Sequence, residues 1–167
     1  PSLVEFRDRF CLPLAQFLAA NGVRVADLAM AEVEWNVGVD AQRPRLMDGA
    51  TELLSAMRAA RIPVGVLSAA AESVVQNDIA RLDLQGRFQP VVGGARSKRE
   101  VLARLVARSA GTVLYVGDTE FDVLEALAAG AVPIGFSGGY RPAGALRAAG
   151  AVEVVDDLRD LIGIVLD

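Results

Sequence analysis

Two aspartates follow an apolar segment in the stretch VLYVGDTEFDV, residues 113–123. Asp118 comes directly after the apolar segment, and Asp122 lies four residues further along the chain. Carboxylates in this arrangement suit a hard, oxygen-seeking cation such as Mg²⁺, which takes one or two carboxylates and completes its shell with water and phosphate oxygens. The stretch therefore predicts a magnesium site at the end of a buried strand.

A serine and a lysine elsewhere in the chain complete a predicted site for a phosphate ester. Ser68 ends the apolar segment VGVLS, where its hydroxyl and the backbone N–H of Ala69 can donate to an anion. Lys98 opens a helix after the segment VVGGARSK and adds a positive charge for phosphoryl oxygens. With the two aspartates, these residues describe a site in which positioning and charge neutralisation do most of the catalysis.

Each of these side chains also has an ordinary structural interpretation. Asp118 and Ser68 could be the N-caps of the helices that follow them. Asp122 could be an acidic residue stabilised by the dipole of a first helical turn, and Lys98 could be a solvated charge. The prediction of a site therefore depends on the order and spacing of all four residues.

Apolar segments alternate with amphipathic helices from residue 46 onward, a pattern typical of a parallel sheet covered by helices. The carboxyl ends of parallel strands meet at one edge of a sheet, so Ser68 and Asp118 are expected to lie together, with Lys98 reaching them from a loop. The fold class is therefore predicted as α/β, a Rossmann-like parallel sheet with flanking helices. The predicted strands are 63–69, 88–94, 112–116, 132–136 and 152–155, and the predicted helices are 48–62, 71–83, 97–109, 121–129, 141–149 and 157–165.

The first 45 residues are expected to form a separate helical segment, which divides the chain into 1–45 and 46–167. Apolar residues at helical spacing predict a helix over 3–21, and Pro13 either kinks this helix or marks its start. A second helix is predicted over about 26–38, with Trp35 packed in a small core.

Composition narrows the chemistry and the partners. The chain has 167 residues, no histidine and a single cysteine, Cys11, which excludes His-dependent nucleophiles, His metal sites and an internal disulfide framework. A net charge of −4 with scattered Lys and Arg indicates no surface for nucleic acid. No apolar run approaches the ~20 residues of a membrane span, and no signal segment is seen, so we expect no membrane partner and a cytoplasmic location.

The order of these motifs resembles that of the haloacid dehalogenase superfamily, in particular its phosphoglycolate-phosphatase-like branch. The likeness covers about residues 46–167. LMDGATELLSAMRAARIPVGVLSAA is similar to the segment that carries the second motif, and VVGGARSKREVLARL to the segment with the third. VLYVGDTEFDVLEALAAGAVPIGFSGGY resembles the segment with the fourth motif, G-D-x-x-x-D.

The resemblance implies a Mg²⁺-dependent phosphatase of small phosphorylated metabolites that works through a phospho-aspartyl intermediate. It implies that Ser68 holds the substrate phosphoryl group and that Lys98 steadies the charge of the phosphoryl-enzyme. Asp118 would ligate Mg²⁺, and Asp122 would support that site. Residues 1–45 would be a reduced helical cap that covers the site.

The chain departs from the family at the first motif, a strand ending in D-x-D-G-T whose first Asp is the nucleophile. The 167 residues contain no such motif, and the pair Asp48-Gly49 is interpreted as the N-cap of a helix. In the family this strand lies between the strands that end in the second and fourth motifs. Its place falls to residues ahead of Pro1, to the segment SLVEF or to a partner chain, and an exposed strand edge there would allow a homodimer.

Enzymatic activity therefore stays open at this point, although the family favours it. The alternative function is a non-catalytic module with the same fold that binds a metal or a phosphate group.

Overall fold

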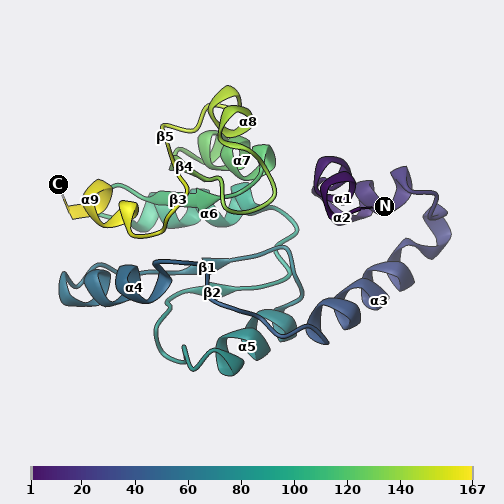
Figure 1. The fold of residues 1–167 in the computed structure, drawn as a ribbon, viewed down its shortest axis with the longest axis horizontal. Coiled ribbons are helices and arrows are strands. Elements are labelled where there is room, and N and C mark those ends of the chain that lie inside the picture. The colour runs from purple at the N-terminus through teal and green to yellow at the C-terminus, as the bar shows by residue number, and fades with distance from the viewer. Residues whose placement is uncertain (1, 167) are drawn as a thin grey trace. The chain divides into compact units, whose positions relative to one another are not determined.

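The computed structural model describes residues 2–166, which fold into parallel strands and helices (Figure 1). This is the α/β architecture that the alternating apolar segments predict. The chain divides into two compact units. Unit 1 comprises Pro1–Asp8, Met47–Ile62 and Ser97–Asp167, and unit 2 comprises Arg9–Leu46 and Pro63–Arg96. The division into 1–45 and 46–167 was drawn along the sequence, whereas the two compact units each combine separate segments, and that division stays a prediction.

Unit 1 is built on a parallel sheet with the strand order β3-β4-β5 (Figure 1). On one face of β4, Ile134 and Phe136 pack with Val155 and Leu161 in an apolar core. Because successive residues of a strand point to opposite faces, Gly135 lies on the other face. The strands are β3 (Leu114–Gly117), β4 (Val132–Phe136) and β5 (Glu153–Val155).

Helices cover both faces of this sheet. α7 and α8 pack on β4, and Gly135 leaves room for Leu146 of α8 on that face. On the opposite face α9 contributes Leu161 to the core and packs against α4. The helices of unit 1 are α1 (Leu3–Arg9), whose last residue belongs to unit 2, α4 (Ala50–Ala59), α6 (Lys98–Arg108), α7 (Glu120–Ala129), α8 (Ala143–Ala148) and α9 (Asp160–Leu166).

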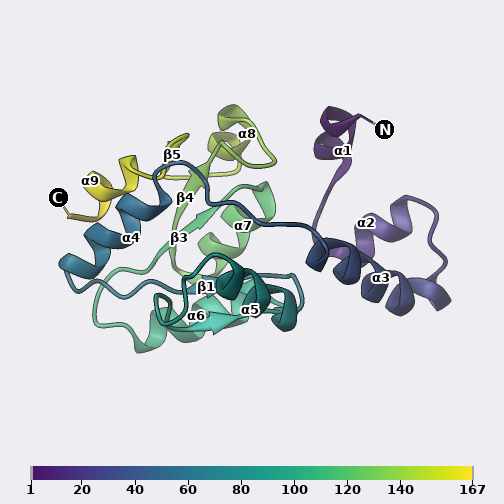
Figure 2. The ribbon, with the colours of Figure 1, turned by 60° about the horizontal axis from the view of Figure 1, so that its bottom comes forward.

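Unit 2 joins a short parallel sheet to a small helical bundle. Figure 2 shows α2 beside α3. The rings of Phe10, Phe17 and Trp35 pack against one another, with centroids 5.2 to 5.9 Å apart. These contacts confirm the small core predicted around Trp35. The elements are α2 (Leu14–Ala20), a 3-10 turn η1 (Val25–Asp27), α3 (Leu28–Asp40), β1 (Val66–Leu67), α5 (Glu72–Arg81) and β2 (Val91–Val92). No helix in the described part of the chain is long and apolar enough to cross a membrane.

Two predictions about the N-terminal segment need correction. The single helix expected over 3–21 is two helices, and of the two alternatives for Pro13 the structure confirms the start of a helix, because α2 begins directly after this residue. Proline has no N–H to donate and a fixed φ, so it ends one helix and suits the start of the next. The segment SLVEF lies largely within α1, so the interpretation of this segment as a substitute strand is wrong.

The single sheet expected from the sequence is divided in two. β1 pairs in parallel with β2, and β3 pairs in parallel with β4. Within residues 2–166 no further strand pairs with β1 or β3, so each lies at an edge of its own sheet.

Asp48 is not the N-cap of α4. The N-cap residue is Gly49, which has a φ of 79°. A Cβ at Gly49 would lie 2.4 Å from Asp157 Oδ1 and 2.6 Å from the backbone nitrogen of Arg159. The Asp-Gly pair therefore serves a close approach between the start of α4 and the loop before α9, where the Asp48 carbonyl also accepts the N–H of Leu158.

We expect Gly49→Ala to lower the free energy of unfolding by about 2 to 4 kcal/mol, because strain at positive φ adds to a backbone clash. Gly130→Ala is the matched control, since Gly130 has a φ of 76° but its nearest atom would be 3.9 Å away. The control should lose only about 1 kcal/mol. Urea unfolding of both variants measures the difference, and equal losses would contradict the close packing at Gly49.

Candidate metal and phosphate site

Lys98 and Asp122 form a buried ion pair. Lys98 is the first residue of α6 and Asp122 lies on the first turn of α7, and their side chains are 8% and 5% exposed. Lys98 Nζ donates to Asp122 Oδ1 at 2.6 Å. Lys98 is therefore not the solvated charge that its surroundings in the sequence allow, and the structure brings together two of the predicted site residues.

Two further side chains donate to the Asp122 carboxylate. The Tyr115 hydroxyl donates to Oδ1 at 3.2 Å, and the Thr119 hydroxyl donates to Oδ2 at 2.6 Å. Burial and the negative charge of Asp122 raise the pKa of Tyr115, which keeps its hydroxyl protonated as a donor. Both oxygens of Asp122 are thus occupied by donors from this chain.

Gly117 admits the Asp122 side chain to the end of β3. A Cβ at Gly117 would lie 2.2 Å from Asp122 Cβ and 2.7 Å from its Cγ. Thr119 is the N-cap residue of α7, and its hydroxyl accepts the N–H of Asp122 at 3.2 Å. The N-cap interpretation of Asp118 is therefore wrong, because the neighbouring threonine caps the helix.

Asp118 is held by a loop that follows β4. Its Oδ2 accepts the N–H of Tyr140 at 3.1 Å, and its carbonyl accepts the N–H of Arg141 at 3.2 Å. A Cβ at Gly139 would lie 2.0 Å from Oδ2, so only glycine lets the loop come this close. No other residue in the described range donates to Asp118 Oδ1.

The surroundings of Asp118 fit a divalent cation. The side chain is half-buried, and burial is the main cause that raises the pKa of Asp118, so a positive charge at this place would stabilise its ionised form. Among the described residues no three Asp, Glu, Cys or His side chains gather into a complete cage. Mg²⁺ needs no such cage, because it keeps waters and binds substrate oxygens alongside one or two carboxylates.

Ser68 and Ala69 lie in unit 2, in the loop between β1 and α5. The Ser68 hydroxyl accepts the N–H of Ala70 at 3.1 Å, which leaves its own proton available to an acceptor. The Ala69 N–H has no acceptor within residues 2–166, and Ala69 is exposed. Ser68 is not the N-cap of α5, since that residue is Ala71. The loop thus offers two donors to an anion, and its approach to Lys98 and Asp118 stays a prediction.

Sequence reasoning missed several residues that shape the site. The Thr-x-x-Asp spacing at Thr119 is a capping signal and could have revealed its role. The pair Gly138-Gly139 indicates a loop that packs closely against another part of the chain, but the sequence does not show that this part is Asp118. Nothing in the sequence signals that Tyr115 donates to Asp122, because a tyrosine in a strand ordinarily indicates apolar packing.

Neighbouring residues on α6 give a matched test of the buried pair. We expect Lys98→Ala to lower the free energy of unfolding by about 3 to 5 kcal/mol, because it leaves a buried carboxylate without its counter-charge. Arg99 pairs with Glu125, but its side chain is 56% exposed. Arg99→Ala should therefore cost less than about 1 kcal/mol. Thermal or urea unfolding separates the two, and a small loss for Lys98→Ala would contradict the buried pair.

Solved structures share the fold of this chain. A predicted phosphatase from Clostridium acetobutylicum superposes with a TM-score of 0.84 at 20% identity, covering 99% of this chain and 82% of that one. A haloacid dehalogenase-like family hydrolase from Streptococcus pneumoniae gives a TM-score of 0.81 at 16% identity, covering 98% of this chain and 81% of that one. These likenesses confirm the predicted fold class.

Sequence comparison identifies the family. Phosphoglycolate phosphatase from Synechococcus elongatus is 31% identical over 110 residues, which is 63% of this chain and 52% of that protein. The chain thus spans about half the length of this relative. The family described as haloacid dehalogenase-like hydrolase matches residues 5–135, which include Ser68, Lys98, Asp118 and Asp122. The chain therefore belongs to the haloacid dehalogenase-like hydrolase family.

Proposed function

We propose that this chain carries the metal and phosphate site of a Mg²⁺-dependent phosphatase acting on a small phosphorylated metabolite. The observation that supports this most is the difference between the hydrogen-bond partners of Asp118 and those of Asp122. Asp122 is saturated with donors, whereas Asp118 keeps one oxygen without a donor from another residue. Family membership and the printed name of the Synechococcus relative support a phosphate ester as the substrate class.

The proposal gives each predicted site residue a separate task. Asp118 would hold the cation, and bound Mg²⁺ would neutralise the charge of phosphoryl oxygens. Asp122 would support the site by fixing Lys98, whose ammonium group adds positive charge for the phosphoryl group. In unit 2, the hydroxyl of Ser68 and the N–H of Ala69 would donate to phosphoryl oxygens.

The nucleophile is the part of this chemistry that residues 1–167 do not provide in the expected motif. The phospho-aspartyl route needs a carboxylate at the end of a strand, and D-x-D-G-T is not found in the sequence. We therefore propose that the 167-residue polypeptide binds the cation and phosphate and turns over phosphate esters poorly.

Magnesium titration tests the assignment of Asp118. We expect weak Mg²⁺ binding by the unchanged chain and at least about a tenfold loss of affinity in Asp118→Ala, because the direct ligand is removed. Asp160→Ala is the control, since Asp160 is an exposed acidic residue on α9 in the same unit. Calorimetric titration measures all three proteins. Equal affinity in Asp118→Ala would exclude Asp118 as the ligand.

Hydrolysis of an aryl phosphate separates a phosphatase from a non-catalytic binding module. We expect the 167-residue polypeptide with Mg²⁺ to show little turnover, for want of the nucleophile. The same assay on a polypeptide extended by the codons ahead of Pro1 should show turnover if they encode a strand ending in D-x-D-G-T. Strong turnover by the 167 residues, abolished in Asp118→Asn, would instead mean that they contain an unrecognised nucleophile.

A further inference from the structure

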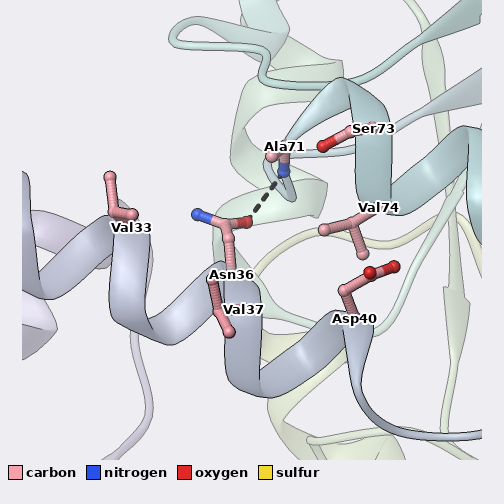
Figure 3. Close-up of a pocket in the computed structure, with 7 residues that line it drawn as sticks. All are labelled: Val33, Asn36, Val37, Asp40, Ala71, Ser73 and Val74. Atoms are coloured by element: carbon pink, nitrogen blue, oxygen red, sulfur yellow. Dashed lines mark hydrogen bonds between the residues drawn. The ribbon is translucent and has the colours of Figure 1, made fainter.

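Asn36 links helix α3 to the loop that carries Ser68. Its Oδ1 accepts the backbone N–H of Ala71 at 2.9 Å, across 35 residues of sequence. Its Nδ2 donates to the carbonyl of Glu32 at 2.7 Å, which fixes the side chain against its own helix. Figure 3 shows Asn36 pointing from α3 to Ala71, with the contact drawn as a dashed line. Both ends of the amide are therefore engaged.

Ala71 is the point where the loop ends and α5 begins. It is the N-cap residue of α5 and has no side chain that could cap the helix. The preceding residues are held within the loop and by the segment after β2, since Ala70 donates to Ser68 Oγ and the Ala70 carbonyl accepts the N–H of Gly94 at 2.6 Å. Asn36 therefore supplies a side-chain anchor for the last residue of this loop.

The packing around Asn36 leaves room between α3 and α5, so the hydrogen bond from Ala71 to Asn36 contributes to the distance between these two helices. A pocket of about 330 Å³ lies between α3 and the start of α5, lined by Val33, Val37 and Val74 beside Asn36. Val33 and Val37 are 58% and 66% exposed. Val74 is 3% exposed, so the hydrogen bond of Asn36 acts beside the apolar packing of Val74 in positioning α3 against the loop.

We propose that Asn36 is a positioning residue for the phosphate-binding loop, Ser68–Ala71. By holding Ala71, it fixes the backbone so that the Ser68 hydroxyl and the Ala69 N–H stay available to phosphate oxygens. The inference rests on the proposed function, and it adds that a residue of the N-terminal helical segment influences phosphate binding through the loop that it holds.

A second contact between the same helices provides the control. Asn77 on α5 donates to Asp40 Oδ1 at 3.0 Å, and Arg81 donates to the same carboxylate at 3.1 Å. These contacts also join α3 to α5, but they lie on the body of α5 and do not touch the loop. Asn77→Ala therefore weakens the helix pair without removing the loop anchor.

The experiment is a titration with inorganic phosphate in the presence of Mg²⁺, on the unchanged chain, Asn36→Ala and Asn77→Ala. We expect Asn36→Ala to raise the Kd for phosphate about fivefold, the effect of losing one positioning hydrogen bond. Asn77→Ala should stay within about 1.5-fold of the unchanged chain. Amide hydrogen exchange at Ala71, followed by NMR, should be faster in Asn36→Ala and unchanged in Asn77→Ala. If Asn36→Ala does not fold, Asn36→Gln is used instead, because its longer side chain displaces the acceptor oxygen.

The possible results separate this inference from the proposed function. Weaker phosphate binding and faster Ala71 exchange confined to the Asn36 variant support the inference. Unchanged phosphate affinity in that variant, or an equal loss in Asn77→Ala, overturns it and leaves the proposed function standing. If the unchanged chain does not bind phosphate, the proposed phosphate site fails and the inference fails with it.

Discussion

The arrangement of the candidate site depends on one buried ion pair, Lys98–Asp122. Removing two charges from water is costly, and such a pair survives only when its geometry is good and its remaining oxygens are satisfied. Tyr115 and Thr119 supply the additional donors to Asp122. Gly117 provides the space, because any side chain there would occupy the position of the Asp122 carboxylate. The requirements of this pair thus explain residues on β3, α6 and α7.

The two aspartates of GDTEFD have different hydrogen-bond partners, because only Asp122 pairs with Lys98. Asp122 is enclosed, and both of its carboxylate oxygens accept hydrogen bonds from side chains of this chain, so it is the counter-ion of Lys98. Asp118 stands at the strand end, and the glycine loop before α8 holds one of its oxygens. A half-buried carboxylate with a raised pKa and one oxygen without a donor from another residue is a place where a cation stabilises the ionised form. Asp118 and Asp122 therefore lie in different environments, although they are only four residues apart in the sequence.

The sequence predicted the fold class and the helices and strands of unit 1 because both depend on local patterns. Strand 132–136 and helix 121–129 agree with β4 and α7 to within one residue, since apolar periodicity and turn residues define them. Lys98 and Asp122 were found through motif order. Tyr115 and Asn36 were not, because their partners are set by tertiary packing that no spacing rule describes. The pair Asp48-Gly49 predicted the start of α4, but not the packing of Gly49 against Asp157 and Arg159, because a close approach between distant segments leaves no local signal.

The central claim is that Asp118 binds the cation while Asp122 remains the partner of Lys98. A crystal structure of the chain grown with Mn²⁺ as a substitute for Mg²⁺, with anomalous scattering to locate the metal, tests it most directly. We expect metal at roughly 2.1 Å from an Asp118 carboxylate oxygen, with Lys98 still bound to Asp122. A metal coordinated directly by Asp122 with Lys98 displaced, or a metal away from Asp118, would contradict it.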